Sequence, residues 1–403
     1  MHLAMALHRF GTPAEQLERH LERVSGRLGL SGQFLATPTS VTASFGFGAD
    51  GHFYLLRRGQ GDADLARLSR LERLADEVGD GRVALAHADV AIDAILAAPP
   101  VYGAALEVLA YGGCSAAVAR LFHGAWAEML VAGGIGTCLG LLLLASRRWP
   151  RLLDLLEVSM AVCSAILAAA CAPAFGGALH QTTATLAGLI VLVPGLAATV
   201  ALTELSTGNL VAGTARLAGA LVRFLKLGFG VAFGTRIGDS LFTAPPELPS
   251  GVVPATEWLA LVAAAAALAV ILQVERRELL WVVLGSLAGL AGLRLGAHLL
   301  SNELAPCVAG LCATLFAHAY ARFFRRTASV IGVPAMLLLV PGSVGYRGVA
   351  AMMHRDVLTG MQAGFAMAVN ATALVAGALL AGLLLPPQAD SPSSSANSKP
   401  KFR

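Results

Sequence analysis

The chain has 403 residues, of which 56% are hydrophobic and 13% are charged, and its formal net charge is +4. A soluble globular chain carries about 25% charged residues, so this composition excludes a protein made only of soluble domains. The small positive excess sits in short clusters, which indicates membrane topology and argues against nucleic-acid binding. The six cysteines form no CxxC pair. We therefore expect no metal site, no disulfide framework and no cofactor.

Residues 1–100 are polar enough to form a small soluble α+β domain. Apolar residues at helical spacing predict a first helix over residues 14–28. The stretch 37–40 (TPTS) predicts a turn or a ligand-approach loop. Strand-like runs on both sides of an Asp-Gly pair predict a β-hairpin over residues 41–56. Two further helices are expected, at residues 64–76 and 83–97.

From about residue 102 the chain becomes strongly apolar. A helix needs about 17–25 mostly apolar residues to cross a bilayer, and about ten stretches meet this requirement. They lie near residues 103–122, 126–145, 152–172, 182–205, 214–236, 257–274, 278–296, 304–321, 329–347 and 360–385. The chain is thereby divided into a soluble domain (1–100), a first membrane half (101–238), an external loop (239–256), a second membrane half (257–386) and a disordered tail (387–403).

Positive residues outside the spans predict the orientation. If the N-terminal domain is cytoplasmic, the Arg- and Lys-rich loops after the second, sixth and eighth spans are cytoplasmic too, as is the tail. The opposite loops, at residues 173–181 and 239–256, contain no Lys or Arg. We therefore predict a multi-pass protein of the lipid bilayer with both termini in the cytoplasm.

One motif occurs in both membrane halves. Val193-Pro194-Gly195 lies in the fourth span and Val340-Pro341-Gly342 in the ninth, at an offset of 341 − 194 = 147 residues. Each half would then hold five spans, and an odd number of spans turns the second half upside down in the membrane. Proline and glycine break a helix, and the carbonyls that are freed are tolerated at depth only beside protein or water. We therefore predict two inverted repeats with a substrate site between the two breaks, near the midplane.

Several ionisable residues lie within the apolar spans. A charge at the bilayer centre costs about 2.5–3.5 kcal/mol on insertion scales, so such a residue is expected to face a cavity or a partner. Arg223 and Asn370 occupy matching positions in the two halves, and we predict that both face the cavity. Glu204 is the candidate proton carrier, because a desolvated carboxyl titrates nearer neutral pH. The alternatives are that Glu204 snorkels to the cytoplasmic end of its span and that Arg223 lies in an interfacial turn.

Short stretches along nearly the whole chain carry a resemblance to one family. They are LHRFG at 7–11, TPTS at 37–40, ASF at 43–45, VPG at 193–195, GNLVAG at 208–213 and VPGSVGYRG at 340–348. In these stretches the chain is similar to the threonine/serine exporters. The resemblance implies a bacterial inner-membrane carrier of about ten spans with a cytoplasmic N-terminal domain, which exports threonine and serine and is driven by protons. Glu204 and Asn209 stand where aspartates are common in that family, which bears on the coupling ion.

The repeat and the resemblance together predict the roles of the site residues. The half-helix ends at Pro194-Gly195 and Pro341-Gly342 would bind the carboxylate and the ammonium of the amino acid. The side-chain hydroxyl of the substrate would be bound by Thr199, Thr203, Ser343 and Tyr346. Arg347 would bind the substrate carboxylate as a bidentate donor. Glu204 would carry the proton, so the protein would be an antiporter.

Alternative functions stay open at this stage. The cargo could be another small metabolite, such as a dicarboxylate. The N-terminal domain could be a membrane-anchored hydrolase with a triad drawn from His8, Ser40, Ser44, Asp50 and His52, although no GxSxG motif is present. A channel would need a continuous polar pore in place of two matched helix breaks. We expect a transporter that is not an enzyme, and the sequence is compatible with a homo-oligomer.

Overall fold

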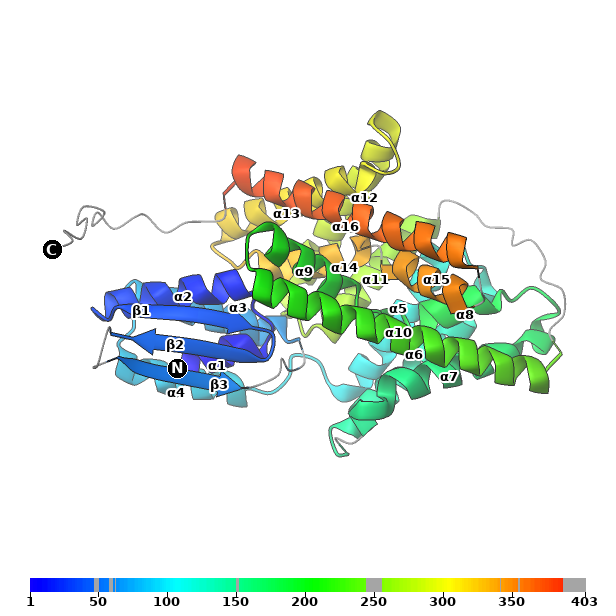
Figure 1. The fold of residues 1–403 in the computed structure, drawn as a ribbon, viewed down its shortest axis with the longest axis horizontal. Coiled ribbons are helices and arrows are strands. Elements are labelled where there is room, and N and C mark those ends of the chain that lie inside the picture. Colours follow the sequence, from blue (N-terminus) through cyan, green and yellow to red (C-terminus); the bar gives the residue numbers. More distant parts are fainter. Residues whose placement is uncertain are drawn as a thin grey trace.

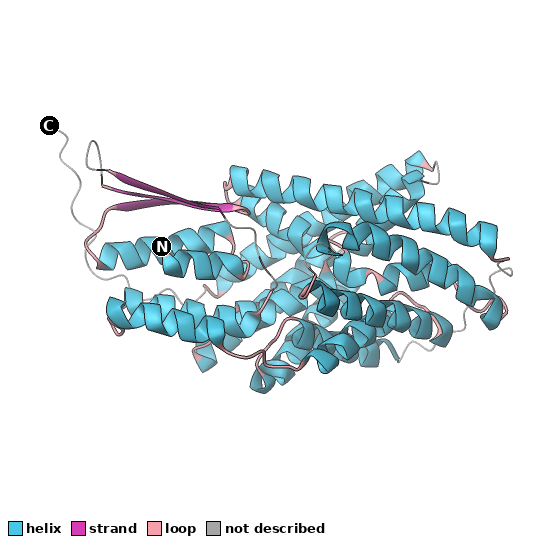
Figure 2. Cartoon of the chain, turned by 90° about the horizontal axis from the view of Figure 1, so that it is seen from below, coloured by secondary structure: helices cyan, strands magenta, loops and turns pink. Residues whose placement is uncertain are grey.

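The computed structural model describes residues 1–46, 51–57, 61, 63–149, 152–243, 256–340, 342–353 and 356–386. The N-terminal domain consists of a three-stranded antiparallel sheet in the order β1-β2-β3 and of four helices. Its elements are α1 (His2–Arg9), α2 (Ala14–Arg27), β1 (Gly32–Thr37), β2 (Ser40–Phe45), β3 (His52–Arg57), α3 (Leu65–Gly79) and α4 (Leu85–Ala97). Figure 2 shows the sheet as a thin layer on one side of the helices. The predicted combination of helices and a small sheet at the N-terminus is confirmed, and the bounds of the domain stay a prediction.

The predicted hairpin is confirmed as the β2–β3 pair, in which Phe45 is opposite His52. The stretch 37–40 is the tight turn between β1 and β2, where the Ser40 N–H donates to Thr37 Oγ1 over 3.0 Å. Alternate residues of β2 face the helices, and Val41 and Ala43 are buried. This alternation is typical of a sheet that is covered on one face only.

The rest of the chain is a bundle of helices (Figure 1). Its elements are α5 (Ala104–Leu121), α6 (Trp126–Ser146), α7 (Leu152–Cys171), η2 (Ala172–Phe175), α8 (Gln181–Gly188), η3 (Ile190–Leu192), α9 (Gly195–Ser206), α10 (Leu210–Leu241), α11 (Thr256–Ile271), η4 (Arg276–Glu278), α12 (Leu279–Leu299), α13 (Ala305–Phe324), α14 (Ser329–Leu339), α15 (Gly342–Met353) and α16 (Val357–Leu384).

Within the described residues, eight stretches are long and apolar enough to cross a membrane, and the bent pair α8 and η3–α9 raises the number to nine. The predicted span at 257–274 corresponds to α11, which is apolar but has only 16 residues. A perpendicular crossing of a bilayer needs about 20 residues. The multi-pass helical membrane fold is therefore observed, and a count of ten spans stays a prediction.

One end of the bundle contacts the N-terminal domain, and we call it the near end. The Leu65 N–H donates to Leu272 O over 2.9 Å, and the Tyr102 N–H donates to Gln273 Oε1 over 3.0 Å. Both acceptors lie in the connection between α11 and α12. Buried residues of α2 and α3 share one apolar cluster with buried residues of α11 to α14. The opposite end of the bundle is the far end.

These contacts fix the direction of the helices. α5 starts at the near end, just after Tyr102, whereas α11 ends there. α9 also ends at the near end, where the Ala14 N–H lies 3.5 Å from Glu204 Oε1. α14 starts there, where Ser329 Oγ donates to a carboxylate oxygen of Glu72 over 3.3 Å. Helices at matching places of the two halves, α5 and α11 or α8–α9 and α14–α15, therefore run in opposite directions.

Small residues let the longest helices approach closely, as is common where packing drives helix association in lipid. A Cβ atom added to Gly234 of α10 would lie 2.5 Å from Val162 O of α7. A Cβ atom added to Gly377 of α16 would collide with Cys307 O of α13. The pair α7 and α10 and the pair α13 and α16 thus use the same device in the two halves.

Candidate substrate site at two crossed helix breaks

Each membrane half contains a helix that is interrupted at the Val-Pro-Gly motif. In the first half, η3 leads to Val193 and α9 begins at Gly195, and the segment Ile190–Ser206 that contains both is bent by 52° from α8. In the second half, α14 ends at Leu339 and α15 begins at Gly342. The Gly195 N–H donates to Val193 O and the Gly342 N–H donates to Val340 O, both over 2.8 Å. The same short-range hydrogen bond therefore closes both breaks.

The two breaks lie directly against each other. A Cβ atom added to Gly195 would lie 2.6 Å from Val340 Cγ1 and 3.2 Å from Gly342 Cα. A Cβ atom added to Gly342 would lie 3.0 Å from Val193 Cγ1 and 3.3 Å from Gly195 Cα. The valine of each motif thus covers the glycine of the other, and any side chain at either glycine would push the two helices apart. Two motifs that are 147 residues apart in the sequence form one crossing.

The hydroxyls predicted on α9 donate to its own backbone. Thr199 Oγ1 donates to Gly195 O over 3.2 Å, and Thr203 Oγ1 donates to Thr199 O over 3.1 Å. Thr199 is buried, one turn beyond the break. A hydroxyl that gives its proton to a carbonyl keeps its lone pairs as acceptors. The first turns of α9 therefore offer acceptor oxygens, and Pro194 is the N-cap residue of this helix.

Tyr346 occupies the position in α15 that Thr199 occupies in α9 (346 − 199 = 147). Its side chain is 1% exposed and belongs to the same buried apolar cluster as Val193 of the other break and Phe224 of α10. Tyr346 therefore packs at the crossing itself. Pro341 and the side chain of Ser343 lie outside the described residues, so their predicted roles stay predictions.

The predicted polar residues of α10, α15 and α16 lie in different environments. Arg223 Nε and Lys226 Nζ each lie 3.3 Å from a carboxylate oxygen of Glu157 on α7, and their side chains are 57% and 45% exposed. Arg347 is exposed on α15, and Asn370 is half-buried on α16. The structure thus places Arg223 on an outer face of α10, next to the buried Phe224, and the substrate-binding roles of these residues stay predictions.

Glu204 lies near the end of α9 and faces the N-terminal domain. Its two carboxylate oxygens accept hydrogen bonds from Nε and Nη2 of Arg216, both over 3.0 Å, and its side chain is 3% exposed. It lies nine residues beyond Gly195, which is about 13 Å along a helix. Sequence reasoning named Glu204 but missed Arg216, its partner on α10. The proton-carrying role of Glu204 stays a prediction.

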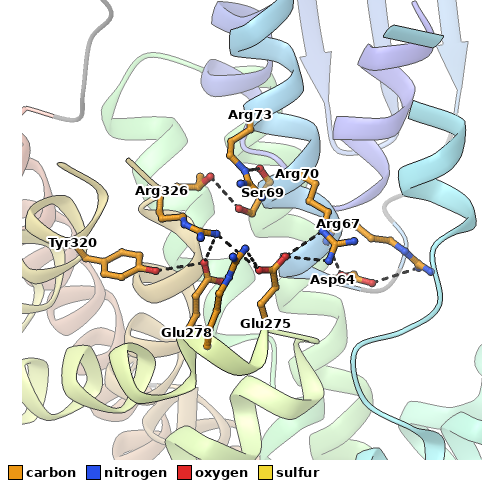
Figure 3. Close-up of polar contacts among 11 residues, drawn as sticks. Asp64, Arg67, Ser69, Arg70, Arg73, Glu275, Glu278, Tyr320 and Arg326 are labelled. Carbon is orange, nitrogen blue, oxygen red and sulfur yellow. Dashed lines mark hydrogen bonds and ion pairs between the residues drawn. The ribbon is translucent and has the colours of Figure 1, made fainter. Parts of the chain in front are cut away.

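Figure 3 shows the polar contacts that join the N-terminal domain to the near end. Arg70 of α3 donates through Nε and Nη2 to Glu275 Oε1, both over 3.1 Å. Arg326 Nη1 lies 3.4 Å from Glu278 Oε1. Burial raises the pKa of the Glu275 carboxyl, but hydrogen bonds from Arg70 and Arg277 outweigh it and hold this pKa below its usual range. Glu275 is therefore an ionised anchor for the domain.

Glu72 of α3 joins the domain to the second broken helix. Gln16 Nε2 donates to Glu72 Oε1 over 3.0 Å, and Ser329 Oγ donates to Glu72 Oε2 over 3.3 Å. Complete burial raises the pKa of Glu72 from 4.5 to about 7, and the neighbouring His20 and Ser329 offset only part of this effect. Ser329 is the first residue of α14. The helix that leads to the second break is therefore tied to a carboxyl whose charge changes near neutral pH.

At the far end, Glu128 of α6 anchors the start of the first broken helix. Glu128 Oε1 lies 2.7 Å from both the backbone N and Nδ1 of His180, the N-cap residue of α8. Its Oε2 accepts from the Ala125 N–H over 2.8 Å, and the side chain is completely buried. Sequence reasoning missed this pair. The available signal was a glutamate in the first turn of a span, where it can satisfy free N–H groups.

The residues of the hydrolase alternative have other partners. His8 Nε2 lies 2.8 Å from Thr37 O, and Ser40 Oγ lies 2.8 Å from Thr37 Oγ1. Ser44 and His52 lie on the paired strands β2 and β3, and Asp50 lies outside the described residues.

In the described part of the chain, no group of three or more His, Cys, Asp or Glu side chains is arranged to hold a metal ion.

A bundle of long apolar helices with two broken helices that meet inside it defines a multi-pass membrane protein. Two family models match the chain. Residues 1–238 match the model described as "Putative threonine/serine exporter", and residues 257–384 match "Threonine/Serine exporter, ThrE". The chain belongs to the threonine/serine exporter family of membrane transporters, and the resemblance seen in the sequence is confirmed.

Fungal membrane proteins are among its relatives. Pheromone-regulated membrane protein 10 of Candida albicans is 27% identical over 356 residues, which are 85% of this chain and 32% of the relative. The protein of the same name from Kluyveromyces lactis is 28% identical over 388 residues, 93% of this chain and 40% of the relative. An uncharacterised protein of Schizosaccharomyces pombe is 27% identical over 360 residues, 86% of this chain and 47% of the relative.

This chain therefore spans less than half the length of these relatives. All three relatives are eukaryotic, and two of them are named as membrane proteins, so the location in a bacterial inner membrane stays a prediction. No solved structure matches the chain.

Proposed function

We propose that this chain is a secondary transporter that exports a small hydroxylated amino acid, threonine or serine, by alternating access. The observation that carries the proposal is the reciprocal contact between the Val193–Gly195 and Val340–Gly342 breaks. Matching helices of the two halves run in opposite directions, which supports an inverted repeat. Transporters built from inverted repeats bind substrate at broken helices near the midplane, where the two repeats meet.

The chemistry of the crossing suits an amino acid. α9 begins at Gly195 and α15 at Gly342, and the first N–H groups of a helix attract a carboxylate. The oxygens of Thr199 and Thr203 accept hydrogen bonds from an ammonium or a hydroxyl group. Tyr346 closes the site on the side of α15 and α10. Because the two breaks touch in this structure, substrate entry requires them to separate.

The remaining predicted residues form the outer part of the site. Pro194 and Pro341 break the helices, and Ser343 adds a second hydroxyl at the start of α15. Arg347, Arg223 and Asn370 are assigned to the path that leads to and from the crossing, where they attract the substrate carboxylate or stabilise an open state. These assignments rest on the positions of the residues in the repeat.

The proposed orientation places the near end in the cytoplasm. Arg276 starts η4, Arg326 precedes α14 and Arg147 follows the end of α6, all at the near end, as the positive-inside rule favours. The driving force is an inward flow of protons, with Glu204 as the proton carrier, and Glu204 must then leave its pair with Arg216 in some step of the cycle. A homo-oligomer is compatible with this orientation.

Efflux from loaded cells tests the substrate and the driving force. Cells with and without the gene are loaded with a threonine- or serine-containing dipeptide, and release of the free amino acid is followed with and without an uncoupler. Gene-dependent release that the uncoupler abolishes is the expected result. Release that does not depend on the gene would remove threonine and serine as substrates. A parallel arm loaded with a labelled dicarboxylate distinguishes the alternative cargo.

A further inference from the structure

Each broken helix is anchored at its outer end by a buried carboxylate from the neighbouring span. In the first half, Glu128 at the start of α6 holds His180 at the start of α8, with 2.7 Å contacts to the backbone N and to Nδ1. The carboxylate is completely buried, whereas His180 is 26% exposed. One side chain therefore satisfies free N–H groups at the starts of two helices and fixes α8 against α6.

The second half contains the corresponding pair. Glu278 immediately precedes α12, and its Oε1 lies 3.4 Å from Nη1 of Arg326, just before α14, and 3.4 Å from the Tyr320 hydroxyl. The Glu278 side chain is 2% exposed. As in the first half, the carboxylate lies at the start of the second helix of the half, and its partner lies at or shortly before the start of the broken helix. His180 and Arg326 are 146 residues apart (326 − 180) and Glu128 and Glu278 are 150 apart (278 − 128), which is close to the offset of 147 at which Glu275 matches Glu128.

The two pairs lie at opposite ends of the bundle. α14 starts at the near end, where Ser329 contacts Glu72. α5 leaves the near end after Tyr102 and has 18 residues, which is about 27 Å of helix, so α6 and Glu128 begin at the far end. A transporter that works by alternating access needs one contact that closes each side. The two carboxylates are placed where such contacts are required.

We infer that Glu128–His180 and Glu278–Arg326 are the two gate locks of the transporter and that they open in turn. This inference rests on the proposed function. When the far lock opens, α8 moves away from α6 and exposes the crossing to the far side. When the near lock opens, α14 moves away from α12 and exposes the crossing to the near side. Glu128 and Glu278 are positioning residues, since neither touches the crossing.

The geometry also gives the N-terminal domain a role. The far lock has two 2.7 Å contacts, whereas both contacts of the near lock are 3.4 Å long. The domain strengthens the near side, because Arg70 holds the neighbouring Glu275 and Glu72 holds Ser329 at the start of α14. The docked domain is therefore part of the near gate.

Cysteine accessibility in the full-length protein tests the locks. The six native cysteines are replaced, and single reporters are placed at the matched positions Thr185→Cys in α8 and Gly332→Cys in α14 (332 − 185 = 147). A Cβ atom at Gly332 has only an ordinary contact, 3.7 Å from Ala317 Cβ, so the change is tolerated. A membrane-impermeant maleimide is applied to intact cells for the far side and to inverted vesicles for the near side.

Loss of a lock is expected to move the two reporters in opposite directions. Glu128→Gln raises far-side labelling of the cysteine at 185 and lowers near-side labelling of the cysteine at 332, each by about tenfold, as expected from loss of a charged hydrogen bond. Glu278→Gln and Arg326→Ala do the reverse. His180→Ala keeps the backbone N–H contact and gives a smaller shift in the same direction as Glu128→Gln. This milder variant keeps the test valid if Glu128→Gln fails to fold.

Two other ion pairs supply matched controls. Glu257 pairs with Arg294 at the far end, and Glu107 pairs with Arg147 at the near end, both at 2.6 Å, and neither pair involves a broken helix. Glu257→Gln and Glu107→Gln are expected to leave both reporters unchanged. Lock variants that shift both reporters in the same direction, or no more than these controls, would overturn the inference. Opposite shifts in a protein that moves neither threonine nor serine would keep the locks and remove the proposed substrate.

Discussion

The two break helices, α9 and α15, begin alike and end differently. Each has 12 residues and starts at the glycine of its motif, and the following helix starts four residues after its end. The residue before that helix is Asn209 in the first half and Asp356 in the second, 147 residues apart. The position of Glu204, however, corresponds to Ala351, and that of Thr199 to Tyr346. The backbone is repeated, whereas the polar side chains are not.

The difference follows from what each helix meets at its end. α9 ends at the near end, where the N-terminal domain covers it, and a buried carboxylate there requires Arg216. α15 runs the other way, toward the far end. The repeated features, the glycines and the helix lengths, must therefore serve the crossing, which both halves build together. The features that differ serve the two ends of the bundle.

The largest expected effect concerns the ion pair between Glu204 and Arg216 of the first half. Arg216→Ala leaves Glu204 buried without its charge partner, and such a loss costs about 3–5 kcal/mol of stability. Glu204→Gln together with Arg216→Met removes both charges and should recover most of the loss. Thermal unfolding of the purified variants in detergent measures both. If Arg216→Ala were as stable as the parent, the pair between Glu204 and Arg216 would open readily, as the proton-carrying role requires.

A smaller effect, at the contact between the N-terminal domain and the second half, depends on pH. The pKa of Glu72 is about 7 in the folded protein against an ordinary value of 4.5. The carboxyl of Glu72 therefore binds its proton more tightly in the folded state than in the unfolded state. The stability that this proton contributes is complete below pH 4.5 and is lost as the pH rises through about 7. This contribution to the free energy of unfolding is at most about 3 kcal/mol. The free energy of unfolding of the parent should fall between pH 5 and pH 8, and the fall should be smaller in Glu72→Gln.

The neighbouring charges define the control for this measurement. His20, on α2, and Asp76, one turn along α3, both act on the pKa of Glu72, so only the difference between parent and Glu72→Gln is informative. Glu77→Gln, on the same helix, should keep the pH slope of the parent. Equal slopes in all three proteins would show that the contact between Glu72 and Ser329 does not limit stability.

Local sequence patterns predicted the parts of the fold that depend on neighbouring residues. The β2–β3 hairpin follows from an Asp-Gly pair between two strand-like runs, and both breaks follow from Pro-Gly in apolar runs. The first strand, β1, was not predicted, because six residues before a turn carry little periodic signal. The weak point in the span count, α11, is a helix of only 16 residues that ends where the N-terminal domain docks.

The partners of the charged residues were not predictable, because they come from distant parts of the chain. His180 is 52 residues from Glu128, and Ser329 is 257 residues from Glu72. No local pattern encodes such a pair, and only the packing of helices brings it together. The crossing was the exception. Two copies of one motif in an internal repeat indicate a pairing over 147 residues, and the structure confirms that Gly195 and Gly342 are in contact.

A third prediction breaks the feature that both halves share. Gly195→Ala places a Cβ atom 2.6 Å from Val340 Cγ1, and such overpacking costs about 1–3 kcal/mol. The closed crossing is then less populated by about tenfold or more, and amino-acid efflux should fall accordingly. Adding Val340→Ala removes the shorter contact and should restore part of the efflux. Gly219→Ala on α10, where an added Cβ has no neighbour within 4 Å, should transport like the parent.

The smallest effect is expected at the matched positions Arg223 and Asn370. Arg223 is 57% exposed, and Lys226 remains beside Glu157 when Arg223 is removed, so Arg223→Ala should cost less than about 1 kcal/mol of stability. Asn370 is half-buried on α16, so Asn370→Ala should have the larger effect on the substrate concentration at half-maximal efflux. Efflux measured at several internal threonine concentrations separates this effect from a change in maximal rate.

The result decides how far the repeat extends beyond the backbone. If Asn370→Ala alone weakens substrate binding, the two positions match in the sequence but serve different environments, like Glu204 and Ala351. If both variants raise the half-maximal concentration equally, while the stability of Arg223→Ala stays that of the parent, Arg223 must leave Glu157 and face the crossing in another state of the cycle. In that case the two halves exchange environments during transport, which is what an inverted repeat with two alternating gates requires.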